Sequence, residues 1–322
     1  MWFDPAGGDY LCREKKAYTF RFRNFVLAML PYMTVQDVSK LTGVSRGTIK
    51  HIDKSYLQKH YSKPRLKEVR RICIDEFAVQ KGHKYMTTVL DADTHKVLYV
   101  GKGRDEACLK QFRKRLQSSG AKVEAVAMDM WPAYINAATN NLPSADIVVD
   151  KFHIEKNVNE CLSDIRKELH RQETDLNKRK VLKGTRWLLL KNNDRLLTDK
   201  EEPQRLEAAL KINEPLAKAY YLKEELKLLW SQTDIKSARK FLGDWVAKAK
   251  ASGIQRMKKT ANMLLSHRTG IFNWFKHQIS TGPLEGINNK IKVLKRKAFG
   301  FRDMDYFVLK ILSMHLNRYA LF

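Results

Sequence analysis

The chain has 322 residues, of which 43% are hydrophobic and 10% aromatic. This composition excludes wholesale disorder and fits a folded protein of about two to three units. Sixty-one Lys and Arg against 35 Asp and Glu give a formal net charge of +26, which favours polyanionic partners. A ribosome-associated or membrane-surface protein is the alternative, and we interpret the charge as that of a nucleic-acid-binding protein.

The cysteines and the N-terminal segment indicate in which cellular compartment the protein is expected. The four cysteines are dispersed without a CxxC pair, so neither a zinc site nor a disulfide framework is predicted. Residues 1–16 read as irregular and lack the basic-then-apolar order of a signal peptide. No run approaches the roughly 18 apolar residues of a membrane span. We therefore expect a soluble, cytoplasmic protein with no membrane partner.

Residues 17–62 are predicted to form a helix-turn-helix domain. An apolar-rich helix covers Tyr18–Met33, and Thr34 is a plausible N-cap for a second helix over Val35–Leu41. Gly43 supplies the turn, and Ser45 caps a third helix from Arg46 onward. The expected apolar interior consists of Val38, Leu41, Val44, Ile49 and Ile52.

The outward side chains of the third helix are of types that meet phosphates and base edges in a recognition helix. We predict DNA contacts from Arg46, Thr48, Lys50 and His51. A generic three-helix unit is the alternative interpretation, and the basic character of this helix favours DNA.

After a basic linker at residues 63–71 the periodicity changes to that of a sheet. The predicted strands are 71–79, 84–93, 96–103, 123–130 and 145–153, with helices from Asp105 and over 131–142. The order β-β-β-α-β-α-β indicates an α/β RNase H-like core with a mixed five-stranded sheet, whose first part is residues 72–153.

The remainder of the chain reads as helical. Residues 154–267 show only helical periodicity, with many Lys and Arg on the polar faces. They are predicted to form a long all-helical insertion. Residues 268–322 then complete the core with C-terminal helices, interrupted near Gly300.

Three acids stand at positions where a sheet and a helix could bring them together. Asp75 lies on the first strand, Asp129 ends the fourth predicted strand, and Glu285 falls in the first turn of a late helix. In an RNase H-like sheet the first and fourth strands are neighbours, so these carboxylates would face one crevice. Three convergent carboxylates suit two Mg²⁺ ions, which cleave phosphodiesters by in-line displacement.

Each acid also has a purely structural interpretation. Asp75 could pair with Arg71, Asp129 could cap the helix that follows it, and Glu285 could belong to a capping box. Their joint position in a strongly basic chain favours the metal site.

The chain resembles the transposases of the ISL3 family of bacterial insertion sequences over about residues 17–322. The resemblance rests on IDEFAVQKGHKYMTTVLDAD, AMDMWPAYINAA, DIVVDKFHIEKNVNECLSDIRKEL and STGPLEGINNKIKVLKRKAFGFRDMDYF. It implies a DDE triad at Asp75, Asp129 and Glu285, two Mg²⁺ ions for which Mn²⁺ can substitute, and a bacterial, nucleoid-associated location.

The resemblance also implies roles for residues outside the triad. Asp150 and His153 match an element that supports the active site in related groups, although a strand-end histidine is an equal alternative for His153. Trp187 lies in the insertion, where related enzymes place a tryptophan near flipped bases, but core packing is favoured here. Basic residues after Glu285 would line a DNA strand, or simply form a solvated face: Lys292, Lys295, Arg296 and Lys297.

One departure concerns the N-terminus. Members of the family usually begin with a cysteine-rich zinc-binding segment, whereas this chain has only Cys12 there. We therefore expect a replaced or shortened N-terminal segment.

The sequence thus predicts a DNA transposase that cleaves element ends and transfers strands. Its partners would be the terminal inverted repeats and target DNA, bound by a homodimer or a higher assembly. Two alternatives remain at this point: an RNase H-like nuclease of recombination or repair, and a DNA-binding regulator with an inactive catalytic domain.

Overall fold

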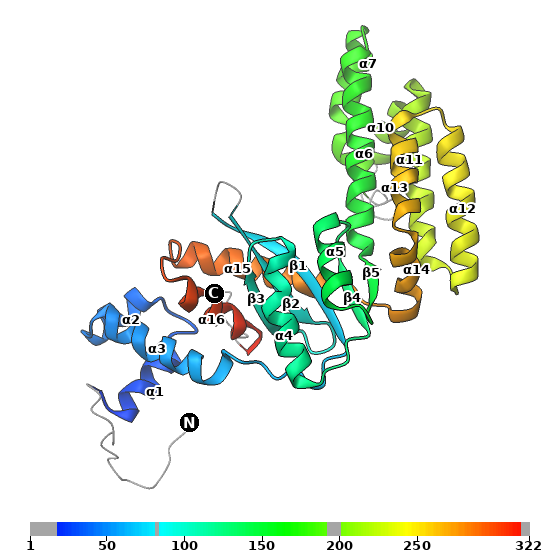
Figure 1. Cartoon of the computed structure of the whole chain (residues 1–322). Helices are drawn as coiled ribbons and strands as arrows, with labels where there is room; N and C mark the ends of the chain where they lie inside the picture. The colour runs from blue at the N-terminus through cyan, green and yellow to red at the C-terminus, as the bar shows by residue number, and fades with distance from the viewer. Residues whose placement is uncertain (1–17, 81–83, 192–200, 317–322) are drawn as a thin grey trace. The chain divides into compact units, whose positions relative to one another are not determined.

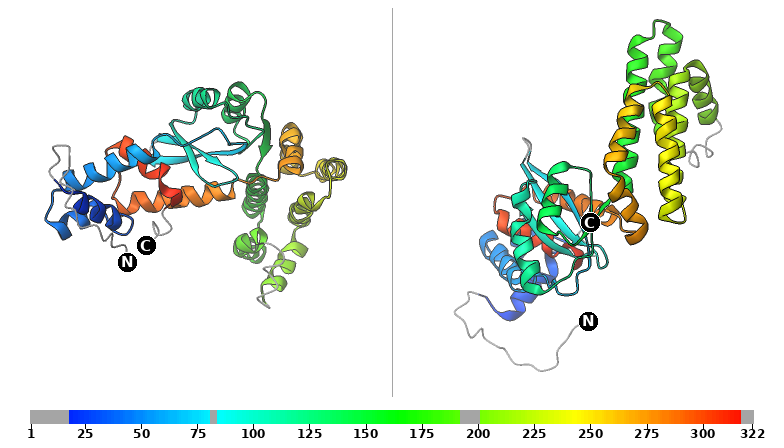
Figure 2. Two further views of the ribbon diagram at one scale, coloured as in Figure 1. Left: turned by 90° about the horizontal axis from the view of Figure 1, so that it is seen from below. Right: turned by 45° about the vertical axis from the view of Figure 1, so that its right-hand side comes forward.

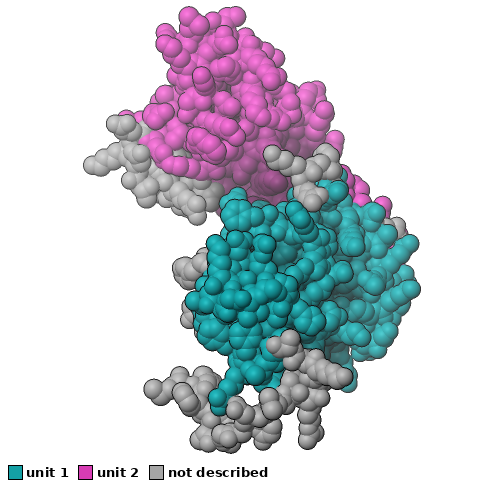
Figure 3. All heavy atoms as spheres, turned by 90° about the vertical axis from the view of Figure 1, so that its left-hand side faces the viewer, with its two compact units in different colours: residues 1–122, 282–322 teal, residues 123–281 magenta. Residues whose placement is uncertain are grey.

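The computed structural model describes residues 18–80, 84–191 and 201–316. The predicted irregular segment at 1–16 lies outside these residues. The chain divides into two compact units, coloured separately in Figure 3. Unit 1 comprises residues 1–122 and 282–322, and unit 2 comprises residues 123–281.

Unit 1 begins with three helices, α1 (Phe20–Met29), α2 (Val35–Thr42) and α3 (Arg46–Tyr61) (Figure 1). Thr34 caps α2 in a capping box with Asp37, and the side chain of Ser45 caps α3, both as predicted at the N-cap positions. Gly43 ends α2 with a φ of 70°, a left-handed conformation that glycine adopts without strain.

The small core of these helices differs from the prediction at one residue. Val26, Val38, Ile49 and Ile52 are buried together, and Val44 packs against them. Leu41, predicted to be interior, is 59% exposed. The core reaches Val38 but stops one turn short of the end of α2, so that prediction was wrong.

Three antiparallel strands follow in unit 1: β1 (Arg71–Gln80), β2 (Lys84–Asp91) and β3 (Val97–Lys102). The short helix η1 (Glu106–Leu109), capped by Asp105 as expected, leads into α4 (Lys110–Ser119). In β1, Ile72, Cys73 and Ile74 are all buried, so both faces of this strand are covered.

The side-chain alternation of β1 assigns its two faces to different helices. Ile74 pairs through β2 with Tyr99, whose ring stacks on Phe112 of α4 at 5.6 Å. On the opposite face, Phe77 makes an edge contact at 6.2 Å with Phe307. Asp75 therefore points to the Phe307 side, where the C-terminal helices lie (Figure 2).

Those C-terminal helices are α15 (Gly282–Lys297), α16 (Met304–Leu312) and η3 (Met314–Leu316). Buried Leu284, Ile287 and Ile291 form the packed side of α15. The α16 helix packs against α3, where the buried carboxylate of Asp53 accepts a hydrogen bond from the Tyr306 hydroxyl and an ion pair from Lys310.

Unit 2 begins with a parallel pair of strands, β4 (Ala125–Met128) and β5 (Asp146–Val149), connected by α5 (Pro132–Asn141). The chain turns into α6 immediately after Asp150, so His153 lies in the first turn of a helix. The predicted strand at 145–153 is thus shorter than expected, and the strand-end interpretation of His153 was wrong.

The other described elements of unit 2 are helices. They are α6 (Lys151–Gln172), α7 (Leu176–Gly184), α8 (Arg186–Leu190), α10 (Glu201–Ile212), α11 (Glu214–Leu226), η2 (Lys227–Ser231), α12 (Ile235–Ala251), α13 (Gln255–Ser266) and α14 (Arg268–His277). The last of these packs closely on β5, since a Cβ at Gly270 would lie 2.7 Å from the Val149 side chain. All nine surround one apolar core that extends from Val149 to Ile271.

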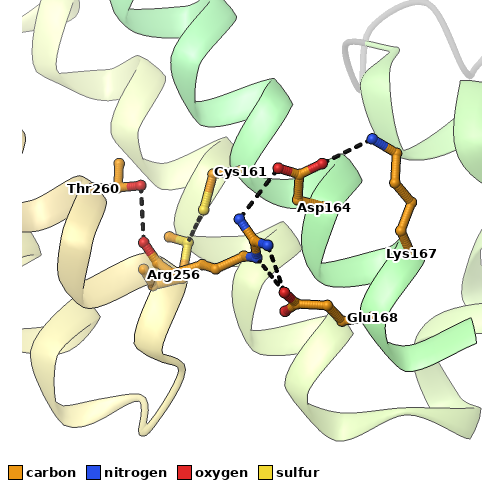
Figure 4. A network of polar contacts seen from close by, with 7 residues as sticks. Cys161, Asp164, Lys167, Glu168, Arg256 and Thr260 are labelled. Carbon is orange, nitrogen blue, oxygen red and sulfur yellow. Dashed lines mark hydrogen bonds and ion pairs between the residues drawn. The ribbon is translucent and has the colours of Figure 1, made fainter. Parts of the chain in front are cut away.

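Buried and half-buried polar groups tie these helices together. Arg256 of α13 binds Glu168 at 2.5 Å and Asp164 at 3.2 Å, both on α6 (Figure 4). Fully buried Trp245 donates its ring N–H to the Leu222 carbonyl at 2.8 Å.

The strands of the two units are those of a mixed five-stranded sheet, three antiparallel and two parallel. This agrees with the predicted order of elements. Across the described ranges, no helix combines the length and apolar character that crossing a membrane requires.

Candidate active site

Asp75 lies on β1 and is half-buried. Its Oδ1 accepts a hydrogen bond from the Glu76 backbone N–H at 2.8 Å, and its Oδ2 accepts one from the side-chain amide of Asn288 at 2.7 Å. Arg71, the alternative partner predicted for Asp75, forms an ion pair with Asp93.

Asn288 comes from α15, three residues after Glu285. Residues three apart on a helix are neighbours on its surface. The hydrogen bond from Asn288 therefore fixes to Asp75 the same helix that carries Glu285. Glu285 lies in the first turn of α15, as predicted, and its side chain is exposed. Two of the three predicted acids are thus on elements joined by a side-chain contact within unit 1.

Sequence reasoning did not select Asn288. Only 5% of Asn288 is exposed. Its amide nitrogen faces two acceptors, Asp75 Oδ2 and, at 3.5 Å, the Glu76 carbonyl, which fixes the orientation of the amide. The signal available beforehand was its spacing of one helical turn from Glu285.

The oxygen atoms of the side chains at this site are suitable ligands for a hard divalent cation. Carboxylate and amide oxygens are the ligands that Mg²⁺ accepts, directly or through its bound water. The Oδ1 atom of Asn288 is buried and has no hydrogen-bond partner among the described residues. In the ranges that the structure describes, no three His, Cys, Asp or Glu side chains lie close enough together to hold an ion.

Asp129, the third predicted acid, directly follows β4 in unit 2 and is half-buried. Its Oδ1 accepts a hydrogen bond from the Trp131 backbone N–H at 2.8 Å, just before α5 begins at Pro132. One carboxylate oxygen of Asp129 therefore orders the strand-to-helix turn, but Asp129 does not cap α5 as the structural interpretation predicted, because the N-cap of this helix is Trp131 and no side chain caps it.

Asp150 is fully buried in unit 2. Its Oδ2 accepts a 2.5 Å hydrogen bond from the Thr281 hydroxyl and lies 3.3 Å from His153 Nδ1. Burial alone would raise the pKa of this carboxyl, but the close contact with His153 and the hydrogen bonds from Thr281 outweigh it and hold the pKa below its ordinary value. Asp150 thereby anchors the residue that immediately precedes α15.

The four predicted DNA-binding residues of α3 differ in their intramolecular contacts, and the His51 ring nitrogen Nε2 lies 3.5 Å from the Ser55 hydroxyl. Arg46 and His51 are exposed. The Thr48 hydroxyl lies 3.0 Å from that of Ser45. Lys50 binds Asp303 at 2.8 Å, as does Lys54 at 2.9 Å.

The basic residues after Glu285 also differ in whether their side chains have partners within the protein. Arg296 is exposed, while the Lys292 ammonium binds the Asn289 side chain at 3.2 Å. Lys295 and Lys297 donate to the carbonyls of Ala78 at 2.8 Å and Tyr32 at 3.2 Å.

Trp187, on α8, is 66% exposed, and the Arg186 guanidinium lies 4.8 Å from its ring centroid. The core-packing interpretation of this tryptophan is therefore wrong.

Comparison with known proteins places the chain in a family. The model of the ISL3 transposase family matches residues 72–311. The chain is 35% identical over 319 residues to the transposase for insertion sequence element IS1001 of Bordetella parapertussis, covering 97% of this chain and 78% of that relative. It is 27% identical over 262 residues to the transposase for insertion sequence element IS1557 of Mycobacterium tuberculosis, covering 74% and 58% of the two chains.

A solved structure agrees on the fold. The Drosophila P element transposase strand transfer complex matches with a TM-score of 0.51 at 9% identity, covering 95% of this chain and 93% of that one. The extent of the family match and the identity to the Bordetella relative together show that the chain belongs to the ISL3 family of DNA transposases.

Proposed function

We propose that this transposase is a DDE enzyme in which Asp75, Asp129 and Glu285 come together when metal binds and then hold two Mg²⁺ ions, with Mn²⁺ as a substitute. The observation that carries the proposal is the 2.7 Å bond between Asp75 and Asn288, because it joins the strand of the first acid to the helix of the third. When bound, the ions activate the attacking water or 3′-hydroxyl and stabilise the leaving oxygen.

The chain's own groups would hold this site in place. Asn288 donates to one carboxylate oxygen of Asp75 and so keeps that carboxylate oriented. Asp129 is oriented by its bond to the Trp131 N–H, and Asp150 fixes the segment that leads into α15. His153 supports Asp150, so this pair has a positioning role.

We assign DNA recognition to two helical regions, the N-terminal helices α1–α3 and the helical insertion. We propose that α1–α3 form a helix-turn-helix that binds the terminal inverted repeats through Arg46, Thr48, Lys50 and His51. Residues 154–267, which fall within helices α6 to α13 and their connections, would form the insertion in an RNase H-like core. Exposed Trp187 of this insertion would stack on a flipped base. Target DNA would be bound by a homodimer or a higher assembly.

The test is a cleavage and joining assay with the full chain. The substrates are a labelled duplex that carries the inverted repeat flanking the coding region and an unlabelled target duplex, with Mg²⁺ or Mn²⁺. Asp75→Asn, Asp129→Asn and Glu285→Gln should each lower cleavage by about 10³-fold, because loss of a metal ligand removes several kcal/mol of transition-state stabilisation. Binding to the duplex, measured by fluorescence anisotropy, should persist.

Asp305→Asn is the matched control, since Asp305 is an exposed acid in the first turn of α16. It should cleave and join at the wild-type rate. Nicked products without joined ones would indicate a nuclease, and binding without any cleavage by the wild-type chain would indicate a DNA-binding regulator. Wild-type cleavage by any of the three acid variants would remove that residue from the site.

A further inference from the structure

We infer that Phe299, in the turn between α15 and α16, is a stacking residue for an unpaired DNA base. The inference rests on the proposed function, because it assumes that the chain binds DNA. It adds a specific site for unpaired bases in unit 1, distinct from Trp187 of the helical insertion.

Phe299 combines a left-handed backbone with a side chain that lies outside the core. The side chain is 100% exposed, and the residue has a φ of 50°, in the left-handed region that L side chains rarely adopt. Among the described residues, the other non-glycine positions with positive φ are the polar His95 and Gln278. A Schellman cap at the end of α15 accounts for the left-handed backbone, whereas packing does not account for the fully exposed apolar ring.

Backbone hydrogen bonds hold the turn in this conformation. The Phe299 N–H donates to the Arg296 carbonyl at 3.1 Å, and the Gly300 N–H donates to the Lys295 carbonyl at 2.9 Å. Phe301, two residues later, stacks on Phe307 at 4.7 Å. Phe301 therefore anchors the turn, while the ring of Phe299 remains available to a ligand.

Phe299 is among the residues that line two hollows. One, of about 450 Å³, is lined in part by Arg46, Lys297 and Arg302. The other, of about 440 Å³, is lined in part by Lys295 and Arg302. Together with exposed Arg296, these side chains surround an aromatic ring with positive charge, which is the combination that binds single-stranded nucleic acid: rings stack on bases while cations follow the phosphates.

A second copy of the chain is a poorer occupant. A symmetric contact through this turn would bring the same arginines and lysines of two chains of charge +26 face to face. DNA supplies the opposite charge, and an unpaired base supplies the flat apolar surface that the ring lacks.

The test compares two fluorescein-labelled DNA probes of equal length with the full chain. One is a perfect duplex, and the other has unpaired bases at its centre. Phe299→Ala should raise the Kd for the unpaired probe roughly tenfold or more and change the Kd for the duplex less than about twofold. Phe299→Tyr retains the aromatic face and should bind both probes like the wild type.

Tyr221→Ala, which removes an exposed aromatic ring from unit 2, is the control and should leave both Kd values unchanged. Equal Kd values for wild type and Phe299→Ala on the unpaired probe would overturn the inference. Equal weakening on both probes would also overturn it, as would a change in oligomeric mass without a change in DNA binding. If the wild-type chain binds neither probe, the proposed function fails as well, and the two failures are thereby distinguished.

Discussion

The helical body of unit 2 and the β1–α15 region of unit 1 hold their acids in different ways. In the helical body, acids are paired with the protein's own cations: Glu168 and Asp164 with Arg256, and Glu224 with Lys223 and Lys227. In the β1–α15 region, Asp75 is bound by the neutral amide of Asn288. The amide donates to one carboxylate oxygen and so fixes the orientation of the acid without itself supplying a positive charge.

The comparison extends to the buried lysine of the helical body. Lys223 is 4% exposed and donates to the carbonyls of Leu189 at 3.0 Å and Lys191 at 3.1 Å. Burial lowers the pKa of Lys223 below its ordinary value. These polar groups stabilise the fold, whereas those around Asp75 orient acceptor oxygens. Substitutions in the first region should therefore change stability, and substitutions in the second should change activity.

Trp245→Ala should have the largest effect on stability. Trp245 is fully buried and donates to the Leu222 carbonyl, so its removal should lower the free energy of unfolding by about 3–5 kcal/mol. Thermal and denaturant unfolding would measure the loss. The cleavage rate per folded molecule should remain at the wild-type value, and a specific loss of cleavage at full stability would contradict the separation of the two regions.

Asn288→Ala should have the opposite profile. Loss of the amide frees the Asp75 carboxylate to rotate, and the cleavage rate or the metal affinity should fall by about 10- to 100-fold. Asn289→Ala, at the neighbouring exposed position, is the control. A metal titration would distinguish the cause, because raising Mg²⁺ should partly restore cleavage by Asn288→Ala. Wild-type metal dependence in this variant would show that Asn288 serves only packing.

Asp150→Asn should lower stability by about 1.5 kcal/mol at neutral pH, since it weakens the bonds from Thr281 and His153 to a buried carboxylate. The pKa of Asp150 is depressed in the folded chain, so its contribution is present above the ordinary value of 3.8 and is lost as pH falls through the folded pKa. Urea unfolding between neutral pH and pH 3 should show a shallower acid dependence for the variant. If the wild type and the variant lost stability equally as the pH falls, Asp150 would not be the source of this pH-dependent stability.

Phe299→Gly should have the smallest effect and the opposite sign. Relief of the left-handed strain exceeds the added entropy of glycine in the unfolded chain, so stability should rise by about 0.5–1 kcal/mol. Differential scanning calorimetry would measure the gain. A fall in the melting temperature would indicate that the ring contributes to packing.

Periodicity and capping residues were enough to predict the order of the elements. Thr34 and Ser45 cap their helices as expected because an N-cap acts through local backbone bonds. Leu41 could not be placed correctly, since its burial depends on how far neighbouring helices extend. His153 was misassigned because β5 ends at Val149, and a buried Asp150 then starts α6.

Sequence patterns predicted only some residues of the candidate site. Asp75 and Glu285 could be selected because acids at a strand and in a first helical turn have recognisable positions. Asn288 was missed because its role depends on a contact across 213 residues of sequence, which no local pattern encodes. The exposure of Phe299 and Trp187 could not be predicted from the sequence either, since aromatic residues in a helical segment normally indicate a buried core.

Iron-mediated cleavage of the polypeptide would test the central claim most directly. Fe²⁺ would replace Mg²⁺ in the complex of the full chain with its inverted-repeat DNA, and ascorbate and peroxide would generate radicals at the bound ion. The three-acid site predicts backbone cuts near residues 75, 129 and 285 in one sample, all lost in Asp75→Asn and all competed by Mg²⁺. Cuts at only one of these positions, or cuts that persist in Asp75→Asn, would contradict it.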